Sequence, residues 1–252
     1  VGDGARDDMT SVLALANRLG TPVVTTFKAK GLVADDHPLG CGVMGRSGTP
    51  VASWMMNESD LVLVFGASFS NHTGIAEYKP LIQVDRDPMA LGRFHSVDVP
   101  VQGDIGITAT ALLDALPDMV ACADLTSEVA ERWALWRDEK ARRRADDTGA
   151  GLSAAAVMES LTRTVDPNAV IAVDVGNNTY SFGRYFETKG QRVMMSGYLG
   201  SIGFALPAAI GAWSATQDFE EFRGRKVISI SGDGGFGQYA MELTTLVKYG
   251  MD

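Results

Sequence analysis

The segment Lys226–Gly237, with the sequence KVISISGDGGFG, constrains the fold of this chain more than any other. Val227, Ile228 and Ile230 form a short β-branched run, which is typical of a strand buried in a parallel sheet. The run passes into the glycine-rich loop 232–235, and a helical pattern of apolar residues follows. This order predicts an α/β unit whose loop presents backbone N–H groups to a phosphate.

Asp233 lies inside this loop, where its carboxylate would repel a phosphate bound by the neighbouring amides. A cation between the two negative groups removes that repulsion. Mg²⁺ prefers oxygen ligands and is commonly held by one or two carboxylates together with phosphate oxygens. The sequence therefore predicts Asp233 as a magnesium ligand.

Two other interpretations of the loop remain open. Gly232, Gly234 and Gly237 also fit the dinucleotide fingerprint Gly-x-Gly-x-x-Gly, whose confirming acidic residue would lie about 20 residues further on, beyond Asp252. The loop could equally be a tight turn in which the glycines avoid steric clashes and Asp233 caps the helix.

Two upstream segments extend the pattern: residues 173–179, with the sequence VDVGNNT, and residues 196–211, with the sequence SGYLGSIGFALPAAIG. In this order and spacing, the three segments resemble the cofactor-binding domain of thiamine-diphosphate-dependent enzymes. The resemblance is to the pyruvate oxidase and acetohydroxyacid (acetolactate) synthase group in particular. Residues before about position 120 resemble the central domain of that group, so the resemblance spans essentially the whole chain.

The resemblance implies roles for the residues of these three segments. The loop Gly176-Asn177-Asn178 would contact the diphosphate, and Gly234 and Gly235 would offer it their backbone N–H groups. Thiamine catalysis also needs a bent cofactor and an activated aminopyrimidine ring.

Two catalytic positions follow from the same resemblance. Ile202 matches the bulky apolar residue beneath the bend of the cofactor, and the carbonyl of Gly200 matches the acceptor of its exocyclic amine. Ile202 as an ordinary core residue is the alternative.

The first half of the chain alternates apolar runs with helical patterns. Residues 61–65 and 81–85 indicate buried strands, residues 99–104 a short edge strand, and residues 31–48 a loop-rich stretch. Alternation of this kind predicts an α/β chain of two doubly wound parallel-sheet domains, the second incomplete. We expect a central domain at 1–122, a helical linker at 123–150 and a partial pyrophosphate-binding domain at 151–252.

Doubly wound sheets bind ligands at the carboxyl ends of their strands. Glycines there admit a diphosphate close to the backbone, and acidic residues can accept hydrogen bonds from ribose hydroxyls. In the resembled group this domain holds FAD, ADP or nothing, and the synthases carry an Arg where this chain has Ser68, so all three remain open. The candidate nucleotide-binding residues are Gly45, Gly48, Gly66, Ser68, Asp85 and Asp104.

The linker carries the basic run Arg142–Arg144, which could bind an anion. Val129, Trp133 and Trp136 are spaced for one face of a helix, which favours a packed helix with a solvated charged face.

The composition of the chain limits the kinds of partner and environment that we expect for it. The net charge of −9 argues against a nucleic-acid surface. The two cysteines, Cys41 and Cys122, are too few for a disulfide framework, which fits a reducing cytoplasm. No apolar run reaches the roughly 18 residues that a membrane span needs. The chain has no initiator Met, so we expect it to be part of a longer polypeptide. We expect the full-length protein to form a homodimer or homotetramer.

The resemblance predicts decarboxylation of a small-molecule 2-oxo acid, with pyruvate as the expected substrate. The product would then be oxidised or added to a second 2-oxo acid. The group's essential Glu and a further Asn ligand of the metal would lie outside this chain, so we expect residues 1–252 alone to be inactive and to bind thiamine diphosphate weakly. A non-catalytic nucleotide-binding module and a nicotinamide-dependent dehydrogenase are the rival functions.

Overall fold

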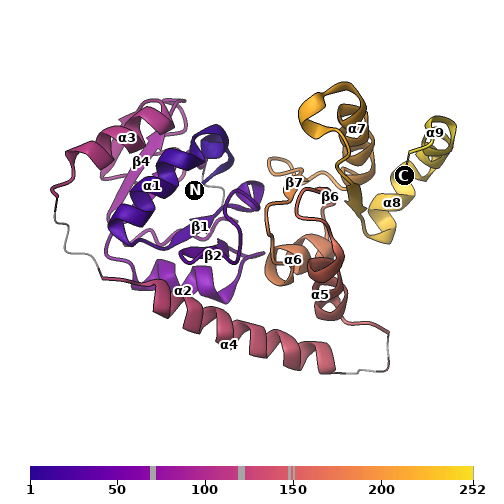
Figure 1. The fold of residues 1–252 in the computed structure, drawn as a ribbon, viewed down its shortest axis with the longest axis horizontal. Coiled ribbons are helices and arrows are strands. Elements are labelled where there is room, and N and C mark those ends of the chain that lie inside the picture. Colours follow the sequence, from indigo (N-terminus) through magenta and orange to yellow (C-terminus); the bar gives the residue numbers. More distant parts are fainter. Residues whose placement is uncertain (69–71, 119–122, 147–148, 150, 252) are drawn as a thin grey trace. The chain divides into compact units, whose positions relative to one another are not determined.

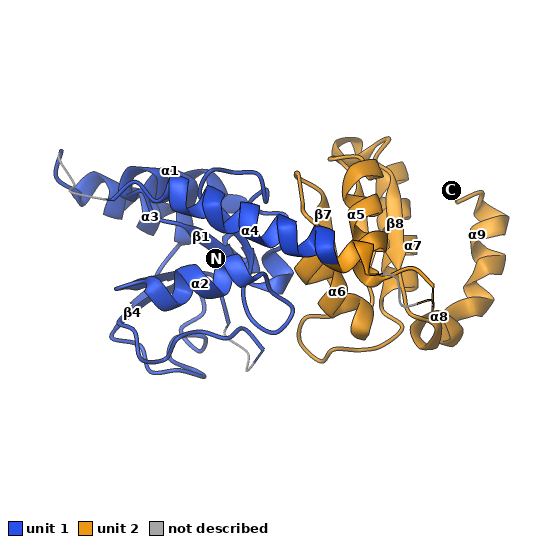
Figure 2. Cartoon of the chain, turned by 90° about the horizontal axis from the view of Figure 1, so that it is seen from below, with its two compact units in different colours: residues 1–142 blue, residues 143–252 orange. Residues whose placement is uncertain are grey.

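The structure is a computed structural model that describes residues 1–68, 72–118, 123–146, 149 and 151–251. The chain divides into two compact units, Val1–Arg142 and Arg143–Asp252 (Figures 1 and 2). Both contain parallel strands flanked by helices, which confirms the predicted α/β fold class. No described helix is long and apolar enough to cross a membrane.

The first unit contains two small parallel sheets. One pairs β1 (Val23–Thr25) with β2 (Gly40–Val43), and the other has the order β3 (Val62–Phe65), β4 (Leu81–Asp85), β5 (Val99–Gln102). The helices of this unit are α1 (Met9–Leu19), α2 (Pro50–Glu58), α3 (Ile105–Ala115) and most of α4 (Thr126–Ala145), with 3-10 turns η1 (Asp3–Asp8) and η2 (Phe27–Ala29).

The strand β2 lies in the stretch 31–48, where the sequence pattern predicted loops. All four residues of β2 are buried, and two of them are glycines. Glycine disfavours strands in general, but here the backbone passes so close to Thr49 that a Cβ on Gly42 would lie 2.8 Å from Thr49 Cγ2. Tertiary packing therefore selects a strand that local propensity does not indicate.

The core of the first unit lies between α1, α3 and the β3–β4–β5 sheet. Val12 and Leu15 of α1 are spaced for one helical face and are buried against Phe65 and Val84 of the sheet. The two helices pack side by side (Figure 1). This packing places the strand ends and the first turn of α3 at one edge of the unit.

Helix α4 carries the charged stretch of the chain. Val129, Trp133 and Trp136 are buried on one face, and the indole Nε1 of Trp133 donates a hydrogen bond of 2.7 Å to the carbonyl of Gly40. Arg142 is exposed and pairs with Glu139 at 2.7 Å. These contacts confirm the packed helix with a solvated charged face.

The buried cysteine of the first unit gives a testable expectation. Cys41 has no exposed surface, and burial raises the pKa of its thiol to about 12. Because the thiolate is the reactive form, a thiol reagent should not modify Cys41 in the folded chain at pH 8 and should modify it after denaturation. A Cys122→Ser variant isolates Cys41, since Cys122 lies outside the described residues. Rapid labelling of the folded variant would contradict the expectation.

The second unit has a single parallel sheet of order β7 (Arg192–Met195), β6 (Val170–Val173), β8 (Val227–Ile230). Its helices are α5 (Ala154–Thr164), α6 (Asn177–Tyr185), α7 (Ala205–Asp218), α8 (Asp233–Tyr239) and α9 (Leu243–Tyr249), with 3-10 turns η3 (Glu220–Phe222) and η4 (Ala240–Glu242). All four residues of β6 are buried, as expected for the central strand.

The helix begins at Asp233, inside the glycine-rich loop 232–235, whereas the sequence pattern predicted a helix that follows the loop. Gly234 and Gly235 therefore belong to the first helical turn, where the backbone N–H groups have no acceptor within the helix. The first helical bond in this region runs from the N–H of Phe236 to the carbonyl of Gly232, at 2.9 Å.

Candidate functional site

Three loops meet at one edge of the β7–β6–β8 sheet. Because β6 and β8 are parallel neighbours, their carboxyl ends lie at the same edge, and the N–H of Asp174 donates to the carbonyl of Ile230 at 2.9 Å. The segment 174–179 follows β6, the segment 196–204 follows β7, and the segment 231–235 follows β8. The three motifs that the sequence singles out are therefore neighbours in space.

Asn178 joins two of these strand ends. Its side-chain amide donates to the carbonyl of Asp174 at 3.1 Å and to the carbonyl of Ile230 at 3.2 Å. The N–H of Gly176, which precedes α6, donates to the hydroxyl of Thr179 at 3.1 Å, so Thr179 provides the helix cap. Asn177 is the first residue of α6 and is exposed. In this structure the side-chain N–H groups of Asn178 therefore donate to backbone carbonyls at the ends of β6 and β8.

Ile202 and Gly200 lie in the loop that follows β7. The side chain of Ile202 is about half exposed, at 49%, and its Cδ1 would lie 3.6 Å from a Cβ built on Gly234. Gly200 has a φ of +67°, a conformation that favours glycine, and a Cβ there would lie 3.8 Å from Val175. Ile202 is therefore a surface residue beside the first turn of α8 and not part of the buried core.

The carboxylate of Asp233 is available for a ligand. The side chain is exposed and makes no hydrogen bond or ion pair with any residue that the structure describes. The first-turn N–H groups of Gly234 and Gly235 lie beside it. One free carboxylate next to free amides fits Mg²⁺ bound together with a diphosphate, since that ion takes much of its coordination from phosphates and water.

The described residues contain no cluster of three or more His, Cys, Asp or Glu side chains that could hold a metal by themselves. Asp233 would therefore need further oxygen ligands of other kinds to hold a magnesium ion.

Large apolar side chains are exposed around the same loops. Tyr198 and Leu199 are both 82% exposed, and Phe236 and Tyr239 of α8 are about two-fifths exposed, at 41% and 39%. Grouped exposed apolar residues indicate a binding surface. Tyr239 lies against the loop that follows β7, since a Cβ built on Gly203 would lie 2.6 Å from its Cε2.

Asp174 is a site residue that the sequence reasoning missed. Its side chain is only 1% exposed, and its Oδ1 accepts hydrogen bonds from the N–H groups of Val175 (2.7 Å), Gly203 (2.8 Å) and Phe204 (3.2 Å). The available signal was an acidic residue that directly follows the uninterrupted apolar run 169–173. Nothing in the local sequence indicates the partners Gly203 and Phe204, which lie 29 and 30 positions away.

In the first unit, the candidate glycines pack against backbone. An ideal Cβ would lie 2.0 Å from the His72 carbonyl oxygen at Gly45 and 2.3 Å from that of Val43 at Gly48. At Gly66 it would lie 2.6 Å from the backbone nitrogen of Ala5. Close packing of the chain on itself accounts for these three glycines without a bound nucleotide.

The acidic candidates of the first unit also have partners within the protein. Asp85 accepts a hydrogen bond from the N–H of Asp87 at 3.0 Å. Asp104 accepts one from the N–H of Ile107 at 3.0 Å, as the cap of α3, and pairs with Arg86 at 2.8 Å. The hydrogen bond from Ile107 is the largest cause of the lowered pKa of Asp104.

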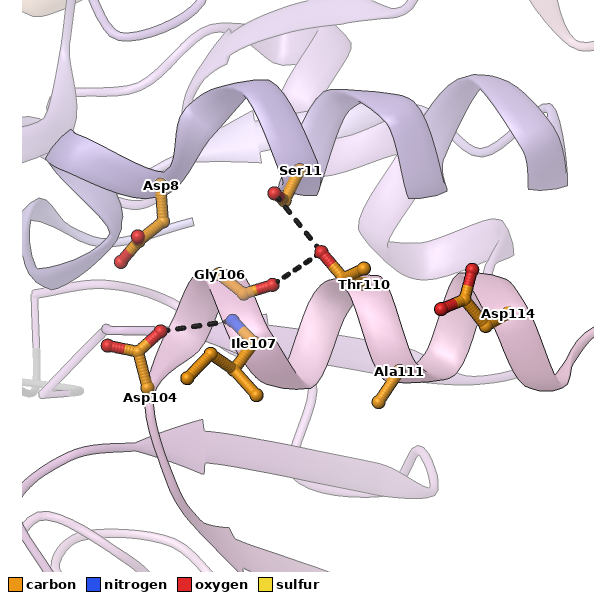
Figure 3. A pocket seen from close by; sticks show the side chains of 8 residues that line it. All are labelled: Asp8, Ser11, Asp104, Gly106, Ile107, Thr110, Ala111 and Asp114. Atoms are coloured by element: carbon orange, nitrogen blue, oxygen red, sulfur yellow. Dashed lines mark hydrogen bonds between the residues drawn. The ribbon is translucent and has the colours of Figure 1, made fainter.

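Figure 3 shows the pocket of about 480 Å³ that Asp104 lines, between α1 and α3. Asp8 and Asp114 line the same pocket, and Ser11 and Thr110 contribute hydroxyl groups. Ser68, at the end of β3, is exposed. Arg86 pairs with two of the pocket carboxylates, those of Asp8 and Asp104, at 2.8 Å each.

Comparison with known proteins gives two family matches. Residues 1–112 match the family described as "Thiamine pyrophosphate enzyme, central domain". Residues 174–252 match the family described as "Thiamine pyrophosphate enzyme, C-terminal TPP binding domain". The second match begins at Asp174 and contains all three loops of the site.

Similar curated proteins cover nearly all of the chain. It is 30% identical to a "Probable acetolactate synthase large subunit" of Methanococcus aeolicus, over 98% of this chain and 42% of that protein. It is 31% identical to the "Acetolactate synthase large subunit" of Corynebacterium glutamicum, over 99% of this chain and 40% of that protein.

The "Acetolactate synthase" of Mycobacterium bovis is 32% identical, over 100% of this chain and 41% of that protein. The chain thus spans about two-fifths of the length of the curated relatives it matches. With its two family matches in the expected order, the chain belongs to the thiamine pyrophosphate enzyme family and is related to the acetolactate synthases.

Proposed function

We propose that this chain provides the magnesium and diphosphate part of a thiamine diphosphate site, in an enzyme that decarboxylates pyruvate. The observation that carries the proposal is the convergence of three loops at one sheet edge. They place the free carboxylate of Asp233, the first-turn amides of α8 and the side chain of Ile202 next to one another.

Each group has a separate task in this proposal. Asp233 would bind the magnesium ion, and the N–H groups of Gly234 and Gly235 would donate to the diphosphate. Ile202 would support the bend between the cofactor rings, and the carbonyl of Gly200 would accept a hydrogen bond from the aminopyrimidine. When bound, thiamine diphosphate supplies the nucleophilic carbon and the electron sink that decarboxylation of a 2-oxo acid requires.

Carboligation is the reaction that we propose after decarboxylation. The relatives quoted above are named as synthases of acetolactate. Acetolactate contains the carbon atoms of two pyruvate molecules less one CO₂, so its formation joins the decarboxylated fragment to a second pyruvate without an external oxidant. The support for synthase chemistry over oxidase chemistry is thus the names of these relatives.

Binding of thiamine diphosphate can be tested on residues 1–252 directly. With ¹⁵N-glycine labelling, addition of Mg²⁺ and thiamine diphosphate should shift the amide signals of Gly176, Gly234 and Gly235. Signals of Gly20 and Gly42 in the first unit serve as the control and should not move. Removal of the metal by EDTA should reverse the shifts, because the diphosphate and Asp233 otherwise repel each other.

Two ligand controls separate the rival functions. Thiamine without its diphosphate should leave the α8 glycines unchanged, and NAD⁺ should not replace thiamine diphosphate. Shifts produced by NAD⁺ alone would favour the dehydrogenase. Formation of acetolactate from pyruvate, measured on the protein at its native length, tests the proposed reaction, and its absence in the presence of both cofactors would contradict the synthase.

A further inference from the structure

The carboxylate of Asp174 is buried at the end of β6 without a cation. Its side chain is 1% exposed, and no Lys, Arg or His side chain that the structure describes forms an ion pair with it. Burial of a charge is costly unless hydrogen bonds compensate for it. Here three backbone N–H groups donate to one oxygen, Oδ1.

Two of these donors belong to the loop that carries Ile202. Gly203 and Phe204 directly follow Ile202 and lead into α7 at Ala205. Gly203 has a φ of +87°, and a Cβ there would lie 2.5 Å from the side-chain oxygen of Gln238 in α8. The hydrogen bonds that these two N–H groups donate to Asp174 therefore hold this loop on the end of β6, at the point where it packs against α8.

The second oxygen of Asp174 contacts the third loop. Oδ2 is buried and has no hydrogen-bond partner among the described residues. A Cβ built on Gly235 would lie 2.1 Å from it, so only glycine allows α8 to approach this closely. A buried acceptor without a donor destabilises the fold, which indicates that the residue serves something other than stability.

We propose that Asp174 is the positioning residue of this site: its carboxylate fixes the loop 200–204 and so sets Ile202 and Gly200 relative to Gly234. The inference rests on the proposed function, since those residues are the ones expected to contact the cofactor. Asp174 itself would act through them and would not touch the reacting atoms.

The hydrogen bonds can be tested without any ligand. Charge-assisted bonds are short and strong, so the amide protons of Gly203 and Phe204 should resonate downfield and exchange slowly in the wild-type chain. Asp174→Ala should shift both signals upfield and speed their exchange. Asp174→Asn keeps an acceptor oxygen without the charge and should move both in the same direction by less. Unchanged signals in the Asn variant would overturn the proposal even if the Ala variant did not fold.

Binding of thiamine diphosphate with Mg²⁺ tests the positioning role. Asp174→Ala should weaken it by about 10- to 100-fold, the range found when groups that orient ligands are removed, and Asp174→Asn should restore most of the affinity. Val173→Ala is the matched control. It truncates a fully buried neighbour on the other face of β6 and should lower stability without changing affinity.

Two results would overturn the positioning role: equal affinity in wild type and Asp174→Ala, or an equal loss in Val173→Ala. Failure of the wild-type chain to bind would count against the proposed function alone. The amide signals of Gly203 and Phe204 would then decide whether Asp174 positions the loop.

Discussion

Replacement of Asp233 by asparagine is expected to weaken Mg²⁺-dependent binding of thiamine diphosphate by more than about 100-fold. Loss of a partner that only orients a metal ligand costs about 10- to 100-fold, and Asp233 is the carboxylate that we propose contacts the ion itself. Isothermal titration of the protein at its native length with thiamine diphosphate, at fixed Mg²⁺, measures the change. The same titration in EDTA should give weak binding in both proteins, and no tighter binding in wild type than in the variant, because without the ion the carboxylate of Asp233 repels the diphosphate.

The effect should be specific to the site and not to charge in general. Asp218→Asn removes an equivalent charge from the exposed end of α7 and should leave the affinity unchanged. The side chain of Asp233 has no partner in the described chain, so its replacement should change stability by less than about 1 kcal/mol. Undiminished binding by Asp233→Asn, or an equal loss in Asp218→Asn, would refute the assignment.

The second large effect that we expect is a loss of folding stability in the first unit when a buried ion pair is broken. Lys30 and Asp35 form a buried ion pair in the first unit, with a distance of 3.2 Å between Nζ and Oδ2 and side chains 1% and 3% exposed. Lys30→Met would leave the carboxylate of Asp35 buried without this cation. Removal of one partner of a buried pair costs about 3–5 kcal/mol, so the unfolding free energy of the first unit should fall by that amount.

Urea denaturation followed by tryptophan fluorescence measures the change, because Trp54, Trp133 and Trp136 all lie in the first unit. Arg86→Met is the exposed control. Arg86 pairs with Asp8 and Asp104, but its side chain is 53% exposed, so its loss should cost less than about 1 kcal/mol. Joint replacement by Lys30→Met and Asp35→Leu should recover part of the stability, and equal costs for Lys30→Met and Arg86→Met would contradict the argument.

Much of the fold could be predicted from local patterns. β8 lies within the predicted segment 226–230, but none of its residues is buried, so the expectation of a buried strand there was wrong. The apolar runs at 61–65 and 81–85 correspond to the largely buried strands β3 and β4 within one residue. A strand that is buried on both faces of a parallel sheet has a continuous run of apolar residues, so its position can be predicted from the sequence. The same patterns could not reveal β2, because its small residues are selected by close backbone packing.

Some residues of the candidate site could likewise be proposed from the sequence, and others could not. The glycine loop and Asp233 could be proposed as a site from the sequence, because a carboxylate among glycines at the start of a helix suggests its chemistry through neighbouring residues alone. Asp174 could not be proposed from the sequence, because its role depends on contacts with Gly203 and Gly235. These two residues reach it only when the loops after β7 and β8 fold onto the end of β6.

The sequence by itself thus determined the alternation of strands and helices and the three motifs, and it is the source of the role proposed for residue 233. The tertiary structure alone decided what the glycines and acidic residues contact. It assigned Gly45, Gly48 and Gly66 to backbone packing and Asp104 to a helix cap, and it placed Asp174 under the loop 200–204. The physical reason is that burial and hydrogen-bond partners are properties of segments brought together from distant positions, whereas propensity and periodicity are properties of a single segment.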